Sequence, residues 1–295
     1  MKHEDYPCLF QKSDTASIKQ QSYYLIASKT EFTFVLLSAI LGGLIICGNI
    51  KASVACLILT AIALFIAFII RIVIQLNRWD RKWFDTRAIA ESAKTATWRY
   101  VMAVDPYQVS DSDKQADKKF VNDLNEIFKM RPEAHLATAS SLASVDKQIT
   151  ERMKEIRKLS VNDRKTIYVK QRVQAQKNWY KAKAKFNGDR DLLWFFRIII
   201  CEALGVCVAV GLIFLPGAFL NPIGVMTTLT AVFCAWVQIK KHRELSQSYA
   251  LAEQELSSTE SLAEHVHTET DLMEYVVNSE NAISREHTMW CAKRI

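Results

Sequence analysis

The sequence predicts an all-α integral membrane protein with two two-helix transmembrane hairpins, four spans in total, and long cytosolic helices. Hydrophobic residues make up 50% of the 295 residues, only 8 residues are glycine, and charged residues are absent from several long stretches. A composition with few glycines and many good helix formers favours helices. Continuous charge-free stretches of this length are typical of membrane spans.

The first hairpin is expected from two charge-free runs, residues 32–50 and 52–70, which Lys51 alone separates. At about 1.5 Å per residue, each run just crosses a hydrocarbon core of ~30 Å. The sequence therefore predicts two spans with their turn at Lys51.

The second hairpin is expected within residues 198–239. Residues 203–239 contain no charged residue or histidine, and Pro216, Gly217 and Pro222 interrupt this stretch. Because these residue types break helices, the spans are placed at about 198–215 and 223–239. A soluble helical core is the alternative, but core helices rarely stay apolar on every face for so long.

The distribution of basic residues predicts the orientation. They gather directly after the second and fourth spans: Arg71, Arg78, Arg81, Lys82, Arg87, Lys240, Lys241 and Arg243. The two hairpin turns offer only Lys51. Cytoplasmic segments carry such an excess of Lys and Arg, so both termini are expected in the cytoplasm. The first 31 residues show no signal-peptide pattern, so the first span is expected to remain in the protein.

The chain divides into a first domain at 1–130, a cytosolic connector at 131–159 and a second domain at 160–295. Both domains have the same order of elements, and short matches accompany it. These matches pair Tyr24 with Tyr180, Lys29 with Lys185, and Ala90, Ser92 and Trp98 with Ala282, Ser284 and Trp290. The order and the spacing together indicate an internal repeat.

The cytosolic helices differ in charge. Ser160 and Asp163 are spaced as a capping box that opens a helix with an aromatic and basic face. The segment after the last span forms one long amphipathic helix by its pattern, with a shift of its apolar stripe between Leu256 and Leu262. Residues 146–197 are rich in Lys and Arg, whereas residues 244–286 are acidic.

Two interpretations of this charge difference remain open. The basic and acidic helices could neutralise one another, or the basic helix could meet anionic lipid headgroups or a nucleotide-bearing partner. Nothing in the segment resembles a phosphate-binding loop, and direct nucleic-acid binding is not expected.

Glu202 is the acidic residue inside a predicted span, and Gly205 and Ala209 share its helix face. Intramembrane carboxylates usually face a bundle interior or water, so these three residues are candidates for lining a pore. The alternative is a carboxylate that reaches the headgroups or pairs with a basic neighbour.

Catalysis and cofactors are not expected. Glu264 and His267 form one Glu-x-x-His pattern, but a metal site in a helical bundle needs a second such pair and further acids. The sequence contains no HExxH, CxxC or glycine-rich phosphate loop. The cysteines, most of which lie in apolar runs, are interpreted as packing residues.

Two sets of residues carry a family resemblance. The stretch ESAKTATWRY, which trails the first hairpin, resembles one subgroup of the SLATT superfamily, the SMODS- and SLOG-associating two-transmembrane effector domains of bacteria. It contributes Glu91, Lys94, Trp98, Arg99 and Tyr100. The second half resembles another subgroup through residues before its hairpin: Tyr168, Arg172, Gln176, Trp179, Tyr180, Lys183 and Ala184. The two matches together cover nearly the whole chain.

The resemblance implies a tandem membrane effector of the bacterial inner membrane, of a class predicted to form pores or otherwise perturb membranes in nucleotide-signalled conflict systems. It also implies a homo-oligomer in the lipid bilayer. Such domains are typically encoded with nucleotide-synthesising or nucleotide-sensing modules. The sequence departs from this pattern, because it contains no recognisable module of this kind. Activation by a nucleotide therefore stays open, and it would require a separate nucleotide-sensing or nucleotide-synthesising partner.

Two other functions are kept as alternatives. One is a membrane scaffold that docks a cytosolic partner through its long helices. The other is a secondary transporter, which the repeats do not favour because both hairpins begin and end inside and are therefore parallel rather than inverted.

A membrane-proximal clamp is the last candidate site. Glu91, Lys94 and Trp98 lie three and four residues apart and so share a helix face. The clamp is expected to combine these with further aromatic and charged residues: Arg99, Tyr100, Arg172, Trp179, Tyr180, Lys183 and Trp290. It could serve the structure alone, or it could open on a signal as a gate.

Overall fold

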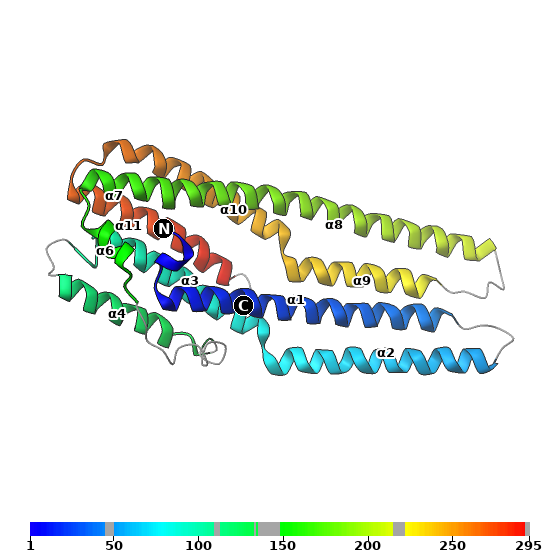
Figure 1. Cartoon of the computed structure of the whole chain (residues 1–295). Helices are drawn as coiled ribbons and strands as arrows, with labels where there is room; N and C mark the ends of the chain where they lie inside the picture. Colours follow the sequence, from blue (N-terminus) through cyan, green and yellow to red (C-terminus); the bar gives the residue numbers. More distant parts are fainter. Residues whose placement is uncertain (45–49, 109–112, 133, 135–147, 215–221, 293–295) are drawn as a thin grey trace. The chain divides into compact units, whose positions relative to one another are not determined.

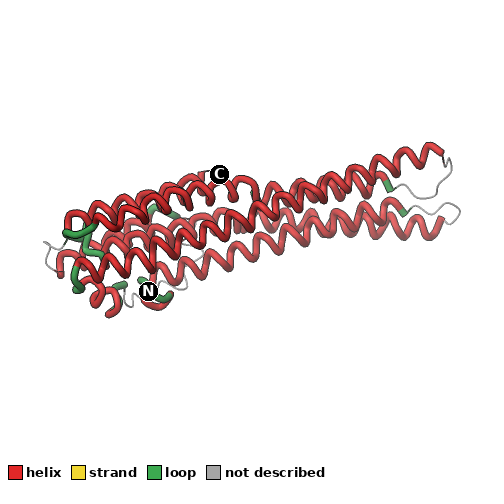
Figure 2. The backbone as a smooth tube through the Cα atoms, turned by 90° about the horizontal axis from the view of Figure 1, so that it is seen from above, coloured by secondary structure: helices red, strands yellow, loops and turns green. Residues whose placement is uncertain are grey.

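The computed structural model describes residues 1–44, 50–108, 113–132, 134, 148–214 and 222–292, with the side chains of the last helix described as far as Ser284. Within these ranges the chain forms helices and turns and no strand, as Figure 2 shows. The predicted all-α fold class is therefore confirmed.

The helices follow one another along the chain as labelled in Figure 1. They are η1 (His3–Asp5), α1 (Cys8–Gly43), α2 (Ile50–Asn77), α3 (Trp79–Val101), α4 (Asp113–Lys129), α6 (Glu151–Arg157), α7 (Val161–Tyr168), the π-helical turn η2 (Val169–Gln174), α8 (Ala175–Phe214), α9 (Ile223–Lys240), α10 (His242–Ser261), η3 (Leu262–His265) and α11 (Glu269–Ala292).

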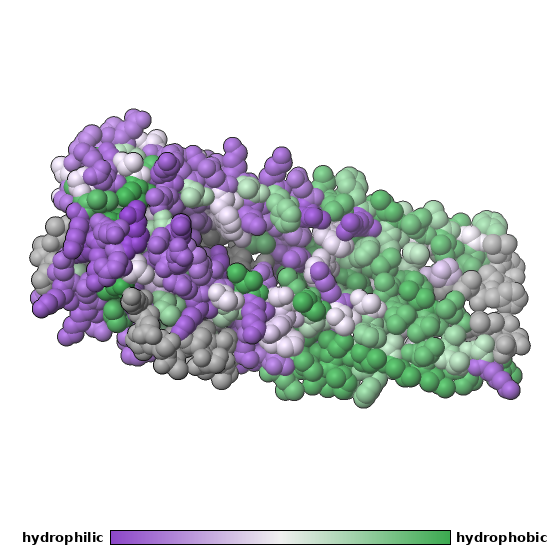
Figure 3. Space-filling view, in the orientation of Figure 1, coloured by the Kyte–Doolittle hydropathy of each residue, from purple (hydrophilic) through white to green (hydrophobic). Residues whose placement is uncertain are grey.

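These helices build two compact units. The polar unit comprises Met1–Gln21, Trp79–Lys185 and Leu245–Ile295, and the apolar unit comprises Ser22–Arg78 and Phe186–Glu244. Helices α1 and α8 contribute residues to both units. On the face seen in Figure 3, hydrophobic side chains cover much of the apolar unit, whereas the polar unit is mostly hydrophilic.

The apolar unit contains the two predicted hairpins, α1 with α2 and α8 with α9. Four helices of the described chain are long and apolar enough to cross a membrane, as expected. Small residues allow close packing within each hairpin. Ala63 and Ala67 of α2 are buried, and a Cβ atom at Gly205 of α8 would lie 3.6 Å from Met226 Cβ of α9.

The ends of the first hairpin differ from the expected positions. Helix α1 ends at Gly43, short of residue 50, and α2 begins at Ile50, so Lys51 lies in the first turn of a helix. Two consecutive glycines, Gly42 and Gly43, stand at the end of α1. Because glycine costs a helix about 1 kcal/mol relative to alanine, the helix is weakest there.

The polar unit has a main core to which both halves of the sequence contribute, and a smaller cluster of Tyr180, Ala252, Leu256 and Ile283. The buried side chains of the main core come from α1, α3, α4, α6, α7 and α11 and include Leu9, Ile89, Trp98, Phe120, Met153, Ile156, Tyr168, Leu272 and Val276. Met153 and Ile156 lie in α6, inside the segment expected to be a connector. This part of the chain therefore contributes to the packing.

The expectation of one long helix after the last span is wrong. The chain forms α10 and α11, which η3 and an extended Val266 separate. Asp271 Oδ2 accepts hydrogen bonds from the backbone N–H groups of His267 and Thr268, and Thr268 Oγ1 accepts one from Asp271 N. These bonds cap the start of α11. The shift of the apolar stripe between Leu256 and Leu262 marks this break.

Candidate functional site

The candidate site lies on the π-helical turn η2, within the helical run that starts at α7. Ser160 begins this run as predicted, because its hydroxyl oxygen accepts a hydrogen bond from Asp163 N at 3.3 Å. A π-helical turn inside an α-helix is rare and is often found at functional sites. Here it carries Arg172, which is 1% exposed.

Arg172 forms a bidentate ion pair with Glu280 of α11. Arg172 Nε donates to Glu280 Oε1 at 2.8 Å, and Arg172 Nη2 donates to Glu280 Oε2 at 2.8 Å. Glu280 is 0% exposed. A planar guanidinium facing a carboxylate in this way gives the strongest and most directional of the ordinary ion pairs.

Two further hydroxyl groups complete the hydrogen bonding of Glu280. Tyr168 Oη donates to Oε1 at 3.0 Å, and Thr95 Oγ1 of α3 donates to Oε2 at 2.8 Å. The carboxylate thus accepts hydrogen bonds from α3, α7 and η2 at once. We call Thr95, Tyr168, Arg172 and Glu280 the buried charge cluster.

Trp98 packs beside the buried charge cluster. Its indole ring meets the Tyr168 ring edge-on, with ring centroids 5.7 Å apart, and its Nε1 donates to Tyr6 Oη at 3.0 Å. Trp98 is 0% exposed. The tryptophan that closes the polar segment after the first hairpin is therefore a core residue that links α3 to the N-terminus and to α7.

Burial and the charge of Glu280 act against each other on the pKa of Arg172 but in the same direction on the pKa of Tyr168. Burial by itself disfavours the charged guanidinium, but the charge and hydrogen bonds of Glu280 raise the pKa of Arg172 above its ordinary value. Burial, followed by the charge of Glu280, also raises the pKa of Tyr168 well above its usual range. The cluster therefore holds one full charge pair and a neutral tyrosine.

Lys94, one of the predicted clamp residues, lies near this pair. Burial and then the positive charge of Arg172 lower the pKa of the Lys94 ammonium. Arg172 Nη1 has no hydrogen-bond partner among the described residues. A buried donor without a partner costs about 1–3 kcal/mol, so the cluster is not optimised for stability alone.

Other predicted clamp residues hold α3 to its neighbours. Arg87 Nη2 lies 2.5 Å from Glu91 Oε1, and Arg87 Nη1 lies 3.2 Å from Asp14 Oδ1 of α1. Arg99 Nη2 donates to Asn281 Oδ1 of α11 at 2.7 Å. Glu91 therefore pairs with Arg87 of its own helix, and its negative charge also acts on Lys94.

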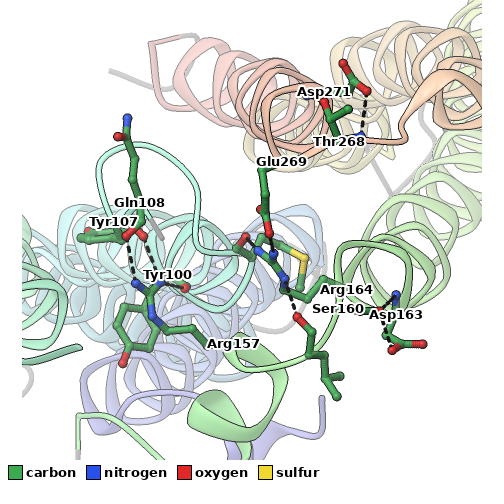
Figure 4. A network of polar contacts seen from close by, with 12 residues as sticks. Tyr100, Tyr107, Gln108, Arg157, Ser160, Asp163, Arg164, Thr268, Glu269 and Asp271 are labelled. Carbon is green, nitrogen blue, oxygen red and sulfur yellow. Dashed lines mark hydrogen bonds and ion pairs between the residues drawn. The ribbon is translucent and has the colours of Figure 1, made fainter. Parts of the chain in front are cut away.

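Tyr100 and the end of α3 are fixed by arginines from the following helices (Figure 4). The Tyr100 hydroxyl donates to Asp117 of α4. Arg157 Nη1 donates to the carbonyl oxygens of Tyr100 and Tyr107 at 2.7 and 2.9 Å, and its guanidinium lies 5.0 Å from the Tyr100 ring centroid. Arginine side chains commonly satisfy the last carbonyls of a helix in this manner.

Arg164 of α7 holds the same turn from the other side (Figure 4). It donates to the carbonyl oxygen of Met102 and forms an ion pair with Glu269 at the start of α11. Its Nε also donates to Leu159 O at 3.1 Å. The turn after α3 therefore depends on arginines from both α6 and α7.

Ala103 closes α3 with an unusual backbone conformation. Its φ is +54°, in the left-handed region. The N–H groups of Ala103 and Val104 donate to the carbonyl oxygens of Tyr100 and Arg99 at 3.0 and 3.1 Å. This bonding is the Schellman motif, whose left-handed position is usually glycine.

Trp179, Tyr180 and Lys183 form a second aromatic contact, between α8 and α10. The Tyr180 and Tyr249 rings stack with centroids 5.8 Å apart, and the Trp179 ring meets Tyr249 edge-on at 5.2 Å. Lys183 Nζ lies 5.7 Å from the Trp179 ring centroid. Tyr180 is buried while Trp179 is 38% exposed. The side chain of Trp290 lies outside the described residues.

The basic and acidic segments do pair within the chain. Ion pairs join Arg164 with Glu269, Arg172 with Glu280 and Lys177 with Glu260. Each pair joins a residue of the basic segment 146–197 to a residue of the acidic segment 244–286. The intramolecular interpretation of the charge difference is thus confirmed for these residues.

The candidate pore residues lie in α8 of the apolar unit. Glu202 is exposed, whereas Gly205 faces Met226 of α9, and Ala209 is partly buried. The structure brings Gly205 into the hairpin contact and leaves Glu202 on the outer surface of the single chain. Whether these three residues line a pore stays a prediction.

The sequence pattern did not single out Glu280, Thr95 or Tyr6. A usable signal was present for Glu280, because it lies four residues after Val276 and so continues the apolar stripe of Leu272 and Val276. A buried carboxylate requires a partner. Arg172 supplies it from the aromatic and basic face of the helical run that starts at α7.

Glu264 and His267 are both exposed. Among the residues that the structure describes, no group of three His, Cys, Asp or Glu side chains could hold a metal ion.

Comparison with protein families gives two matches that follow one another along the chain. Residues 7–165 match the family described as SMODS and SLOG-associating 2TM effector domain 3, and residues 168–290 match SMODS and SLOG-associating 2TM effector domain 1. Neither curated proteins nor solved structures give a match. The buried charge cluster joins Thr95 of the first match to Tyr168, Arg172 and Glu280 of the second.

Proposed function

Since the chain belongs to the SLATT family of two-transmembrane effector domains and carries two of its subgroups in tandem, we propose that it is a non-enzymatic pore-forming or membrane-perturbing effector. SLATT domains are associated with effector roles in defence systems. In this proposal the apolar unit acts on the membrane as a homo-oligomer. The polar unit receives a signal from a separate nucleotide-synthesising or nucleotide-sensing protein.

The observation that carries the proposal is the exposure of the four spans. In their most apolar windows, only 17%, 17%, 6% and 0% of the residues are buried within the chain. Spans with so few fully buried residues leave apolar surface uncovered in the single chain. Their apolar faces can be covered by lipid, by further copies of the chain, or by both.

Glu202 supports the involvement of further copies. A charged side chain that faces lipid costs about 2.5–3.5 kcal/mol at the centre of a bilayer, although less near its surface. Glu202 is exposed on the single chain. If a second copy packs against this face, the carboxylate gains a protein or water environment and attracts cations.

The buried charge cluster supports a regulatory role for the polar unit. Buried ion pairs contribute little net stability, but they favour one arrangement because breaking one partner leaves an uncompensated charge. The cluster ties the first family segment to the second through Glu280. In the proposal, the arrangement that this cluster favours keeps the effector inactive. A signal that separates α11 from α3 and η2 then activates it.

Dye and ion leakage from liposomes that contain the purified full-length chain tests the proposal. We expect the wild type to release cations when a nucleotide-signalling partner or a cyclic nucleotide is present. Glu202→Gln should reduce the release of cations at equal protein content, because it removes the charge and keeps the size. The matched control is Asp189→Asn, which removes an exposed carboxylate of α8 that precedes the span.

The outcomes separate the alternatives. Equal leakage from wild type and Glu202→Gln contradicts the pore-lining role of Glu202. No leakage under any condition, with a cytosolic partner still bound to the chain, favours the scaffold function instead.

The proposed orientation places both termini in the cytoplasm and the chain in the inner membrane of a bacterium. The basic residues that follow α2 and α9 support it. Reporter fusions after residues 1, 130 and 295 should all report a cytoplasmic location, and a tag at Lys51 should report the opposite side. An external signal from the fusion at residue 130 contradicts the two-hairpin topology.

A further inference from the structure

A cavity of about 540 Å³ lies within the apolar unit, between α1, α8 and α9. Its volume falls in the range of ordinary ligand-binding pockets. Its lining is divided by chemistry. One part is apolar and includes Phe32, Leu36, Leu229, Val232 and Phe233, and the other part holds Lys29, Arg190, Lys240 and His242.

Positive charge and aromatic rings meet at the basic part of the cavity. Lys29 Nζ and Lys240 Nζ lie 5.3 and 5.4 Å from the centroid of the Trp236 ring. The Arg190 guanidinium lies 5.3 Å from the centroid of the Phe186 ring. Among the described residues that line the cavity, none carries a carboxylate. Among the described residues, Lys29 and Arg190 form no ion pair with a carboxylate.

The cavity follows the direction of the membrane spans. Lys29 and Arg190 precede the apolar stretches of α1 and α8, and Lys240 follows that of α9. Phe32, Leu36 and Val232 lie inside those stretches, and Trp194 and Trp236 lie where the stretches begin or end. Tryptophan at such a position is typical of the membrane–water interface.

From this arrangement we infer that the cavity binds an anionic phospholipid of the leaflet at the Lys29 end of the spans. The phosphate of the headgroup lies among Lys29, Arg190 and Lys240, and an acyl chain lies along Phe32, Leu36 and Val232. Basic pockets between transmembrane helices at the cytoplasmic side bind such headgroups in other membrane proteins.

The apolar wall favours a lipid over a soluble anion. A free phosphate ester would contact the three basic side chains but leave the apolar part of the cavity uncovered. Each CH₂ group of an acyl chain that is buried there contributes about 0.8 kcal/mol. A zwitterionic lipid fills the apolar part equally well, but its cationic headgroup becomes a fourth cation beside the three basic side chains.

Native mass spectrometry of the full-length chain in a nonionic detergent tests the inference. The probes are dioleoyl phosphatidylglycerol, dioleoyl phosphatidylcholine with the same acyl chains, and glycerol 3-phosphate as the soluble headgroup. We expect phosphatidylglycerol to bind at least about tenfold more tightly than phosphatidylcholine. Lys29→Gln and Arg190→Gln should each weaken phosphatidylglycerol binding about fivefold, which is the value of one basic residue near an anionic headgroup.

Matched variants control for indirect effects. Lys29→Arg keeps the charge and should keep the affinity. Lys51→Gln removes a lysine of the apolar unit that does not line the cavity, and it should have no effect. Val232→Trp fills the apolar part and should weaken the binding of both lipids. Thermal unfolding of each variant without lipid identifies any variant that has lost its fold. If Lys29→Gln is such a variant, the comparison of Arg190→Lys with Arg190→Gln takes the place of the comparison of Lys29→Arg with Lys29→Gln.

Three results would overturn the inference. They are equal affinity for the two lipids, an equal loss in Lys51→Gln and Lys29→Gln, and displacement of phosphatidylglycerol by glycerol 3-phosphate at the same concentration. The last result assigns the cavity to a soluble anion. Because binding is measured without any leakage assay, the result stands apart from the proposed pore activity.

Discussion

Arg172 and Glu280 lie on helices that are far apart in the sequence and meet through two hydrogen bonds of 2.8 Å, with both side chains almost completely excluded from solvent. Taking two charges out of water costs several kcal/mol for each ion, and their attraction offsets this cost only while the pair is intact. Removing only one charge of this pair should therefore strongly reduce the stability of the polar unit.

Glu280→Gln is expected to destabilise the polar unit by about 3–5 kcal/mol, because it leaves the Arg172 charge buried without its partner. Thermal unfolding in detergent measures the loss. The double variant Arg172→Met with Glu280→Leu should lose less than Glu280→Gln, since it removes both charges. Glu260→Gln is the matched control, and it should cost at most about 1 kcal/mol because Lys177 and Glu260 are partly exposed. A loss in Glu280→Gln as small as this control would contradict the role given to the pair.

The two tryptophans that the structure describes in the clamp should behave differently. Trp98→Ala is expected to cost about 3–5 kcal/mol, because Trp98 is fully buried and its loss leaves a cavity beside Tyr168. Trp179→Ala should cost less than half as much, because Trp179 is 38% exposed. Unfolding in detergent compares the two variants. Equal losses would mean that the burial of Trp98 does not determine its contribution.

The membrane part of the fold could be predicted from the sequence with little ambiguity. A charge-free stretch long enough to cross a bilayer has few structures open to it, because every backbone polar group must be satisfied within the helix. The four spans follow from this rule. The end of α1 at Gly43 was missed because an apolar stretch shows where a helix can lie and does not show where it ends.

The polar unit could be predicted less completely. The local signal for a helix start was reliable, as the predicted Ser160 cap shows. The partner of Arg172 was missed, although Glu280 continues the apolar stripe of α11, because pairing across the unit also depends on how α11 turns back after η3. That turn rests on Thr268 and Asp271, and the shift of the apolar stripe before it was interpreted as lying within one helix. Each compact unit contains residues of both family segments. A division of the chain into consecutive domains therefore does not reproduce the two units.

Stability should fall at alkaline pH because buried tyrosines resist ionisation. Burial, as the largest cause, raises the pKa of Tyr6 and of Tyr275 to about 12. Between pH 10 and 12 the unfolded chain loses these protons while the folded chain keeps them, so deprotonation favours unfolding. The contribution of each tyrosine to the free energy of unfolding is fully present below pH 10 and is lost as the pH rises through 12. At about 1.4 kcal/mol per pKa unit, Tyr6 contributes roughly 3 kcal/mol.

Thermal unfolding in detergent at several pH values from 9 to 12 checks this prediction. Lys94 acts in the opposite sense, since its lowered pKa makes the folded chain lose a proton before the unfolded chain does. Its contribution therefore increases stability as the pH approaches its ordinary pKa of 10.5. Tyr6→Phe should show a weaker decline above pH 10 than the wild type. The same decline in both proteins would show that Tyr6 is not responsible.

Ala103, in the turn after α3, adopts a φ of +54°. A left-handed conformation costs an L-residue with a Cβ atom about 1–2 kcal/mol relative to its preferred region, and glycine does not carry this cost. Ala103→Gly removes this cost, but the loss of one buried methyl group and the larger backbone entropy of unfolded glycine offset most of the gain, so we expect a net stabilisation of the polar unit of less than about 1 kcal/mol.

The same substitution within α3 provides the control. Ala96 is buried and helical, so Ala96→Gly should destabilise the unit by about 1 kcal/mol. Thermal unfolding of the two variants in detergent should thus give shifts of opposite sign from one chemical change. A destabilised Ala103→Gly would mean that Arg157 and Arg164, which bind the carbonyl oxygens of Tyr100, Met102 and Tyr107, already offset the strain at Ala103 and that its methyl group matters more than its φ angle.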